Sequence, residues 1–461
     1  MRHVVVPVLA SIVAGSLLTG CPDRTLSEVN PIRDPVETKA IPVKLNRDLD
    51  LLFVIDNSGS MSEEQTSLRA NFPAFINVLN TIEGGLPNIR IGVISTNVGT
   101  GGVNIGGCST ATKPQGDDGL LLTNGCPGLT AAFIEDIGLD NGNRQRNYSG
   151  QLADVFGCMA NLGTSGCGFE QPLESIFRAL QPNKNPGFLR DNAFLGVVII
   201  SDEDDCSAKG PELFGDATAS NTSVLGPRTS FRCFEHGITC ANDPNPRAFG
   251  TKTGCEPKVG SQYMKDIQPY VDYLKSLKAD PKKVVVAGIL GNVDDAKTAI
   301  VGADPDDATR AALQPSCTSA SGEAVPEFRT KAFLEQFPDR NSVTTICNDQ
   351  LSDALTDIAE LLKKAIGNPC IENQLADQNP DLPGIQYECS VTDVTDPNGP
   401  NRSETVIPEC ALNGNTPPCW SFISDPMRCA TAPDNRAVEV NRGNVTVPDD
   451  TVLQVQCVVE P

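Results

Sequence analysis

Histidine is almost absent from this sequence, since the 461 residues include only His3 and His236. No two cysteines have the Cys-x-x-Cys spacing that is common in zinc sites. Zinc centres and Ser-His or Cys-His dyads for nucleophilic catalysis therefore have very little material. Basic residues are also few: 36 Lys and Arg stand against 58 Asp and Glu, which gives a formal net charge of −22. This balance argues against nucleic-acid binding, which needs a basic face.

Long apolar runs are missing after the N-terminus. The first run, from Val4 to Leu18, is too short to stay as a membrane-spanning helix and is typical of a signal peptide. It ends in Leu-Thr-Gly before Cys21, which resembles a bacterial lipobox whose cysteine is lipidated. We therefore expect residues 1–21 to be a lipoprotein signal peptide with Cys21 as the lipid anchor. An ordinary signal peptide cleaved nearby is the alternative. Residues 22–45 contain four prolines among polar residues and are interpreted as a tether.

Cysteine is abundant, with 17 in the chain, of which 16 remain once Cys21 is set aside. An even number in an exported protein indicates disulfide bonds. Sequence alone does not fix their connectivity. Proximity along the chain suggests four pairs: Cys108 with Cys126, Cys158 with Cys167, Cys317 with Cys347, and Cys370 with Cys389.

The most informative stretch begins with the apolar run Leu51–Ile55, which has the length of a buried strand. A polar turn follows, with Asp56, Ser58 and Ser60 at alternating positions. A helical pattern of apolar residues then begins near Ser62. A carboxylate and two hydroxyls are therefore placed where a strand ends and a helix begins. In open α/β sheets ligands bind at this edge.

A second strand of the same kind runs from Leu195 to Ser201 and is followed at once by Asp202. A continuous apolar run of this length is typical of a central parallel strand. Because the carboxyl ends of parallel strands meet at one edge, we expect Asp202 to lie near Asp56.

The Asp-x-Ser-x-Ser pattern after an apolar strand resembles the metal-ion-dependent adhesion site of the von Willebrand factor type A family, which includes the integrin I domains. In that family a Gly-Thr pair before a helix supplies a further ligand, and a second strand ends in an aspartate. The resemblance implies a site for Mg²⁺, or for Mn²⁺ or Ca²⁺, at which an Asp or Glu of a protein partner completes the coordination. The implied metal residues are Asp56, Ser58, Ser60, Thr164 and Asp202.

The chain departs from the family pattern at two places. The usual Gly-Thr-x-Thr run is absent, so Ser165 remains an alternative to Thr164. Glu203 replaces the glycine that follows the second aspartate, and it either adds negative charge or points to solvent. The next two residues, Asp204 and Asp205, are interpreted as a solvated acidic loop.

The remaining elements predict an α/β fold: a doubly wound, mostly parallel sheet flanked by helices, as in the type A family. We expect this domain over residues 46–367, with disulfide-clamped insertions at about 97–146 and 206–260. Residues 370–461 contain six cysteines and short alternating runs, and they predict a small disulfide-rich β domain.

The main functional hypothesis is a cell-envelope lipoprotein, without enzyme activity, that acts in adhesion or envelope assembly. It would be lipid-anchored at the outer membrane or cell surface and would bind a protein partner through the shared metal. One alternative is a metal-dependent hydrolase using Asp56, Asp202 and Asp204, although no nucleophile–base pair is visible. Another is a structural spacer in which the type A site is idle.

Overall fold

The computed structural model describes most of the chain after residue 34. The described residues are 35–43, 46–82, 84–110, 112–139, 141–241, 243–319, 322–397, 399–426, 429, 432–448 and 451–460. The predicted signal peptide, the lipidation at Cys21 and the first part of the predicted tether lie outside these ranges. Within them, no helix has the length and apolar character needed to cross a bilayer.

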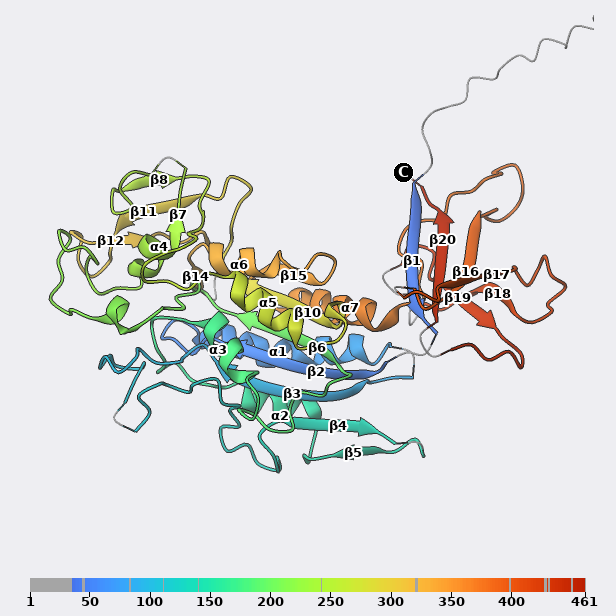
Figure 1. Cartoon of the computed structure of the whole chain (residues 1–461), viewed down its shortest axis with the longest axis horizontal. Helices are drawn as coiled ribbons and strands as arrows, with labels where there is room; N and C mark the ends of the chain where they lie inside the picture. Colours follow the sequence, from blue (N-terminus) through green and yellow to red (C-terminus); the bar gives the residue numbers. More distant parts are fainter. Residues whose placement is uncertain are drawn as a thin grey trace, which may run out of the picture.

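A seven-stranded mixed sheet forms the centre of the larger part of the molecule (Figure 1). Its strand order is β15-β10-β6-β2-β3-β4-β5, and the first five strands are parallel to their neighbours. The last two strands join antiparallel at one edge. The bounds are β2 (Asp48–Ile55), β3 (Asn88–Ser95), β4 (Ile134–Gly138), β5 (Arg144–Arg146), β6 (Phe194–Ile200), β10 (Val284–Leu290) and β15 (Asn341–Thr345).

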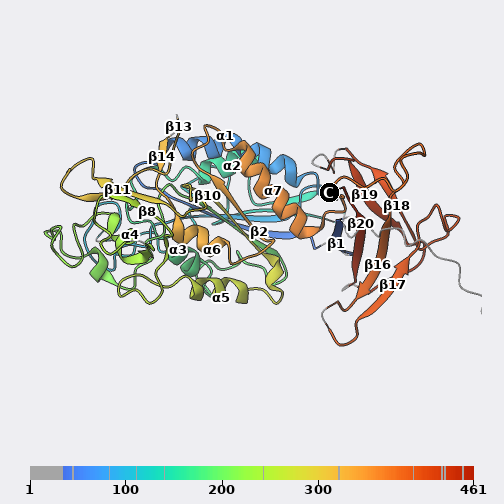
Figure 2. The same ribbon diagram turned by 90° about the horizontal axis from the view of Figure 1, so that it is seen from above.

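Helices cover both faces of this sheet (Figure 2). One face packs on α1 (Ser62–Leu79), α2 (Leu152–Met159) and α7 (Ser352–Gly367). The other face packs on α3 (Pro172–Ala179), α5 (Gln268–Ser276) and α6 (Phe328–Leu334).

Alternate residues of β2 enter the two cores. Phe53 packs among the rings of Phe72 and Phe156 on one face, whereas Leu52 and Val54 enter the core on the other. Burial of each such side chain stabilises the fold by about 1.5–3 kcal/mol. A sheet buried on both faces explains why its central strands are continuous apolar runs rather than alternating ones.

The two insertions carry structure of their own. Residues 97–146 form loops and then the antiparallel strands β4 and β5. The second insertion and the segment after β10 form short elements at the end of the sheet opposite the C-terminal strands (Figure 1). These are η1 (Pro211–Phe214), α4 (Phe231–Gly237), β7 (Ile238–Thr239), β8 (Gly250–Lys252), β9 (Glu256–Pro257), β11 (Ala299–Ala303), β12 (Ala311–Leu313), β13 (Cys317–Ser319) and β14 (Gly322–Ala324). The short helix η2 (Pro281–Lys283) directly precedes β10.

The C-terminal part is a separate set of strands with a small core around Trp420 and Val455. A four-stranded antiparallel sheet has the order β1-β20-β16-β17, and β18 pairs with β19. The bounds are β1 (Val36–Pro42), β16 (Cys389–Thr395), β17 (Ser403–Ile407), β18 (Cys419–Ser424), β19 (Arg436–Asn441) and β20 (Val452–Val458).

Strand β1 corrects the interpretation of residues 22–45 as a tether. Residues 36–42 pair along their whole length with β20, and Ile41 is buried in the C-terminal core. Pairing with β1 satisfies backbone groups of β20 that would otherwise lie at an open edge. From Val36 onward, the chain therefore forms a strand of the C-terminal sheet, passes through the α/β part and then returns to that sheet.

All 16 cysteines after Cys21 form disulfides, as expected for an exported chain. The predicted pair Cys317–Cys347 is confirmed, but the other three predicted pairs are wrong. Partners lie in loops that the fold brings together, and these are not always the nearest cysteines in sequence. The observed pairs are Cys108–Cys167, Cys126–Cys158, Cys206–Cys233, Cys240–Cys255, Cys317–Cys347, Cys370–Cys429, Cys389–Cys457 and Cys410–Cys419.

Candidate cation-binding site

Three central strands end level with one another at the carboxyl edge of the sheet. Ile55 of β2 pairs with Ile200 of β6, which pairs with Ile289 of β10. The ladder continues one step further, because the backbone N–H of Asp56 donates to the Ile200 carbonyl at 2.9 Å. The first residues after β2 and β6 are thus adjacent, as the sequence predicts.

Asp56 is completely buried, at 0% exposure, and organises the turn that follows it. Its Oδ1 accepts the backbone N–H of Ser58 at 2.7 Å, and its Oδ2 accepts the Ser201 hydroxyl at 3.1 Å. This turn brings the Ser58 and Ser60 hydroxyl oxygens to 3.2 Å from each other. Ser58 is buried, at 5% exposure, whereas Ser60 is exposed, so the two hydroxyls lead from the buried carboxylate toward the surface.

Asp202 completes this group. It is 3% exposed, and its carboxyl is close enough to the side chains of Ser60 and Asp56 to interact with both. The structure therefore brings together four of the five predicted metal residues. Within the described chain, Oδ1 of Asp202 has no hydrogen-bond partner. A buried polar atom without a partner is costly and rare, and at a functional site it indicates an absent ligand or ion.

The surroundings of this group raise the pKa of both of its carboxyls. Burial raises the pKa of the Asp56 carboxyl well above its usual range, and the neighbouring Asp202 and Glu203 carboxyls raise it further. Burial also raises the pKa of Asp202. The charged neighbours that act on these two carboxyls are all acidic. A cation bound here would offset both the lost hydration and the mutual repulsion.

The loop that carries Thr164 is held against the motif by Gln65 of α1. The Gln65 amide donates to the carbonyls of Asp56 and Gly163, at 2.9 Å in each case, and its Oε1 accepts the Gly163 N–H at 3.1 Å. The Asn57 carbonyl accepts the Gly166 N–H at 2.7 Å. The backbone on both sides of Thr164 is thus fixed beside the turn.

The Thr164 side chain itself is exposed, and so is that of Ser165. In the described part of the chain the Thr164 hydroxyl makes no hydrogen bond with the other predicted residues. The choice between Thr164 and Ser165 as a ligand therefore stays a prediction.

Glu203 and Glu170 form a further pair of carboxyls, which the sequence did not predict. Glu203 is partly buried and hydrogen-bonds with Glu170, which precedes α3 and is 1% exposed. Burial, with the charge of Asp202, raises the pKa of Glu203 to about 7. The position of Glu203 directly after Asp202 signalled its added charge, but no sequence pattern places Glu170 beside it.

Glu64 is a second acidic residue that was not predicted from the sequence. It lies in the first turn of α1, is buried, and its Oε2 has no hydrogen-bond partner in the described chain. Burial raises its pKa from 4.5 to about 7. The available signal was helical spacing, since Glu64 is four residues before the buried Leu68 and therefore on the inner face.

The interpretation of Asp204 and Asp205 as a solvated loop is wrong. Asp204 accepts the backbone N–H groups of Arg329 and Thr330 at the start of α6. Asp205 is completely buried, forms an ion pair with Arg329 at 3.1 Å and accepts the N–H of Leu173 at 3.2 Å. Both carboxylates hold helices in place, so Asp204 is not directed toward Asp56.

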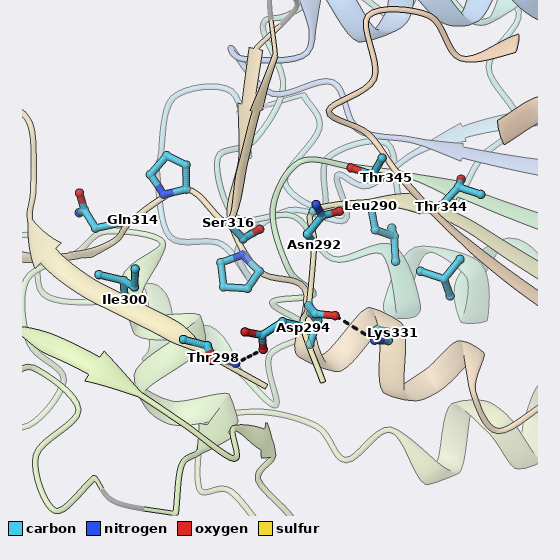
Figure 3. Close-up of a pocket in the computed structure, with 15 residues that line it drawn as sticks. Leu290, Asn292, Asp294, Thr298, Ile300, Gln314, Ser316, Lys331, Thr344 and Thr345 are labelled. Carbon is cyan, nitrogen blue, oxygen red and sulfur yellow. Dashed lines mark hydrogen bonds between the residues drawn. The ribbon is translucent and has the colours of Figure 1, made fainter. Parts of the chain in front are cut away.

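Two cavities, of about 540 Å³ and about 570 Å³, lie near this edge. The smaller is formed at the ends of β10 and β15, and Figure 3 shows Asn292, Asp294 and Lys331 among its residues. The Lys331 ammonium donates to the carbonyl of Val293 at 3.1 Å. The other cavity, of about 570 Å³, includes Glu170 and Glu203 in its lining and therefore adjoins the candidate site.

In the described ranges, no three or more His, Cys, Asp or Glu side chains are arranged to hold one metal ion. The predicted set contains two carboxylates and otherwise relies on hydroxyl oxygens, which hard cations such as Mg²⁺ accept. The metal therefore stays a prediction that the unpaired Asp202 oxygen and the acidic surroundings fit.

No family model and no curated protein matches this sequence. Similar solved structures include the pilus adhesin SpaC from Lactobacillus rhamnosus GG, with 11% identity and a TM-score of 0.31 over 92% of this chain and 40% of that chain. The pilus adhesin RrgA from Streptococcus pneumoniae has 11% identity and a TM-score of 0.29 over 92% and 58%. The adhesive tip pilin GBS104 from Group B Streptococcus agalactiae has 9% identity and a TM-score of 0.28 over 92% of this chain and 81% of that chain.

This chain thus spans less than two thirds of the length of the first two of these adhesins. Similarity at such TM-scores carries no argument about function. The function of the chain is therefore argued from its own residues.

Proposed function

We propose that this chain binds a protein partner through a divalent cation held by Asp56, Ser58, Ser60 and Asp202, with Thr164 or Ser165 as a further ligand. The observation that carries the proposal is the buried Oδ1 of Asp202, which lacks a partner in the described chain and belongs to a carboxyl that interacts with the Ser60 side chain. The residue types fit Mg²⁺, and also Mn²⁺ or Ca²⁺, because all of them offer oxygen.

The chemistry of this donor set explains why it suits binding. Two of the four side chains are neutral hydroxyls, so the ion would keep part of its charge. A bound ion of this kind attracts a carboxylate, which an Asp or Glu side chain of the partner would supply. Asp56 would act mainly by orienting the Ser58 turn, to which it is already hydrogen-bonded.

The architecture is in keeping with the same proposal. Five parallel strands with helices on both faces fit the doubly wound fold of the von Willebrand factor type A family, in which the ion lies at the carboxyl edge of the sheet. We propose a role in adhesion or envelope assembly at the cell surface, with a lipid anchor at Cys21. A hydrolase is less well supported, because Asp204 is occupied by the backbone of α6.

Titration calorimetry with MgCl₂, MnCl₂ and CaCl₂ on the mature chain tests the proposal. We expect binding of one ion per chain, lost in Asp202→Asn and weakened in Ser60→Ala. Matched controls are Asp191→Asn and Ser62→Ala, which alter exposed residues of the same types outside the site. Absence of binding for all three ions, or equal binding by Asp202→Asn and wild type, contradicts the proposal.

A further inference from the structure

The cavity of about 570 Å³ beside the candidate site has an unusual lining. It lies between the end of β6, α4, and the strands β12 and β14. None of its lining residues is Lys, Arg or His. Its acidic lining residues are Glu170, Glu203, Asp204, Asp304, Asp306 and Glu323.

One acidic residue of this lining, Glu170, is buried rather than at the surface. Its side chain is 1% exposed, yet its Oε1 has no hydrogen-bond partner in the described chain. The side chain that it does contact, Glu203, is also acidic. The lining thus contains an acidic pair and an unused acceptor, both of which suit a cationic group.

Part of the lining is apolar. Phe231 and Phe234 of α4 line the cavity together with Leu313 and Val325. A basic side chain has the same two-part character, with an apolar stem and a charged head. Aromatic rings in an acidic cavity also favour an organic cation over a bare ion, because cations are attracted to ring faces. The volume lies within the range of ordinary ligand pockets.

The cavity and the candidate metal site share structure. Glu203 directly follows Asp202, and the backbone N–H of Val325 donates to the Asp202 carbonyl at 3.0 Å. A partner segment that placed a carboxylate at the ion would therefore have this cavity next to it.

We propose that this cavity receives a Lys or Arg side chain of the partner, beside the Asp or Glu that meets the metal. The pairing with the metal rests on the proposed function, whereas binding of the basic group does not require an ion. The partner would thus present an acidic and a basic residue close together.

The first test uses N-acetyl-arginine amide and its neutral isostere N-acetyl-citrulline amide, titrated into the mature chain in EDTA and followed by NMR. We expect saturable binding of the arginine compound only. Glu170→Gln should weaken this binding by about tenfold or more, since it removes one carboxyl of the buried pair. Asp295→Asn changes an exposed carboxylate outside the cavity and should leave it unchanged.

Because Glu170 is buried, its variant is paired with Asp306→Asn/Glu323→Gln, which alters two exposed rim residues and spares the core. This double variant should also weaken arginine binding. No binding of the arginine compound, equal binding of arginine and citrulline, or full binding by both variants overturns the proposal. Ca²⁺ binding that survives Asp202→Asn but not Glu170→Gln also overturns it, because the cavity then holds an ion.

A second experiment distinguishes the cavity proposal from the metal-site proposal. In MgCl₂, a peptide with adjacent Asp and Arg should bind more tightly than its citrulline version. If Ser60→Ala and wild type bind the Asp-Arg peptide equally while the arginine preference persists, the metal proposal fails and the cavity proposal stands. If the peptide requires Ser60 but citrulline replaces arginine without loss, the cavity proposal fails and the metal proposal stands.

Discussion

Replacing Asp202 by Asn should change the stability of the protein in opposite directions with and without a divalent ion. Without an ion, wild type buries a carboxylate whose Oδ1 has no partner in the described chain and whose charged neighbours are acidic. An unsatisfied buried group costs about 1–3 kcal/mol, and more when it is charged. In EDTA at mildly alkaline pH, Asp202→Asn should therefore raise the free energy of unfolding by about 1 kcal/mol or more.

With a bound ion, wild type should instead be more stable than Asp202→Asn. An ion at a hundred times its dissociation constant stabilises the folded state by about 2.7 kcal/mol. For a domain of this size that corresponds to a rise in Tm of about 5 °C. Wild type should show this rise in MgCl₂, and Asp202→Asn should show little of it because a ligand is lost.

Thermal and urea unfolding, each run in EDTA and in MgCl₂, provide the measurement. Asp191→Asn, at an exposed position before β6, is the matched control and should behave as wild type. An equal response of Asp202→Asn and wild type to Mg²⁺ would place the ion elsewhere. Lower stability of Asp202→Asn in EDTA would show that the native carboxylate is satisfied, and the reasoning would be refuted.

Three other predictions follow from the same contacts. Burial raises the pKa of Glu64 to about 7, so the folded state binds this proton more tightly than the unfolded state does. The free energy of unfolding should therefore fall as the pH rises from about 4.5 to about 7. Urea unfolding should show a smaller fall for Glu64→Gln than for wild type. Gln65→Ala should weaken Mg²⁺ binding by about tenfold in calorimetry while circular dichroism stays unchanged, because the Gly163 loop loses its link to Asp56; full affinity would contradict this. Lys39→Pro should lower the unfolding temperature of the C-terminal sheet in calorimetry, because in the β1–β20 register the Lys39 N–H faces β20 and proline removes this donor, and an unchanged transition would argue against the β1–β20 pairing.

The central strands could be predicted because their physical signal is strong. The run Leu195–Ser201 was expected to be a strand from its continuous apolar sequence, and β6 (Phe194–Ile200) agrees with it to within one residue at each end. Strands covered on both faces need apolar residues at every position, and a sequence shows this directly. The convergence of Asp56 and Asp202 followed from the same reasoning, since parallel strands end at one edge.

The elements that were missed depend on contacts distant in sequence. Val36–Pro42 has few apolar residues and becomes a strand only because β20, more than 400 positions later, offers a partner. The wrong disulfide pairs have the same cause. Glu170 and Glu203 come from different loops, and nothing in either local sequence indicates that the two carboxyls meet.

The pairing of β1 with β20 has a mechanical consequence. Tension applied between the candidate site and the residues before Val36 would run along the axis of β1. Because β1 leads directly into β2 along the chain, its backbone would carry this load into the α/β sheet, and the seven paired positions from Val36 to Pro42 would hold the C-terminal sheet against the loaded strand. The Cys389–Cys457 disulfide fixes β20 to the next strand of that sheet. The C-terminal sheet would therefore support the segment through which force reaches the candidate site.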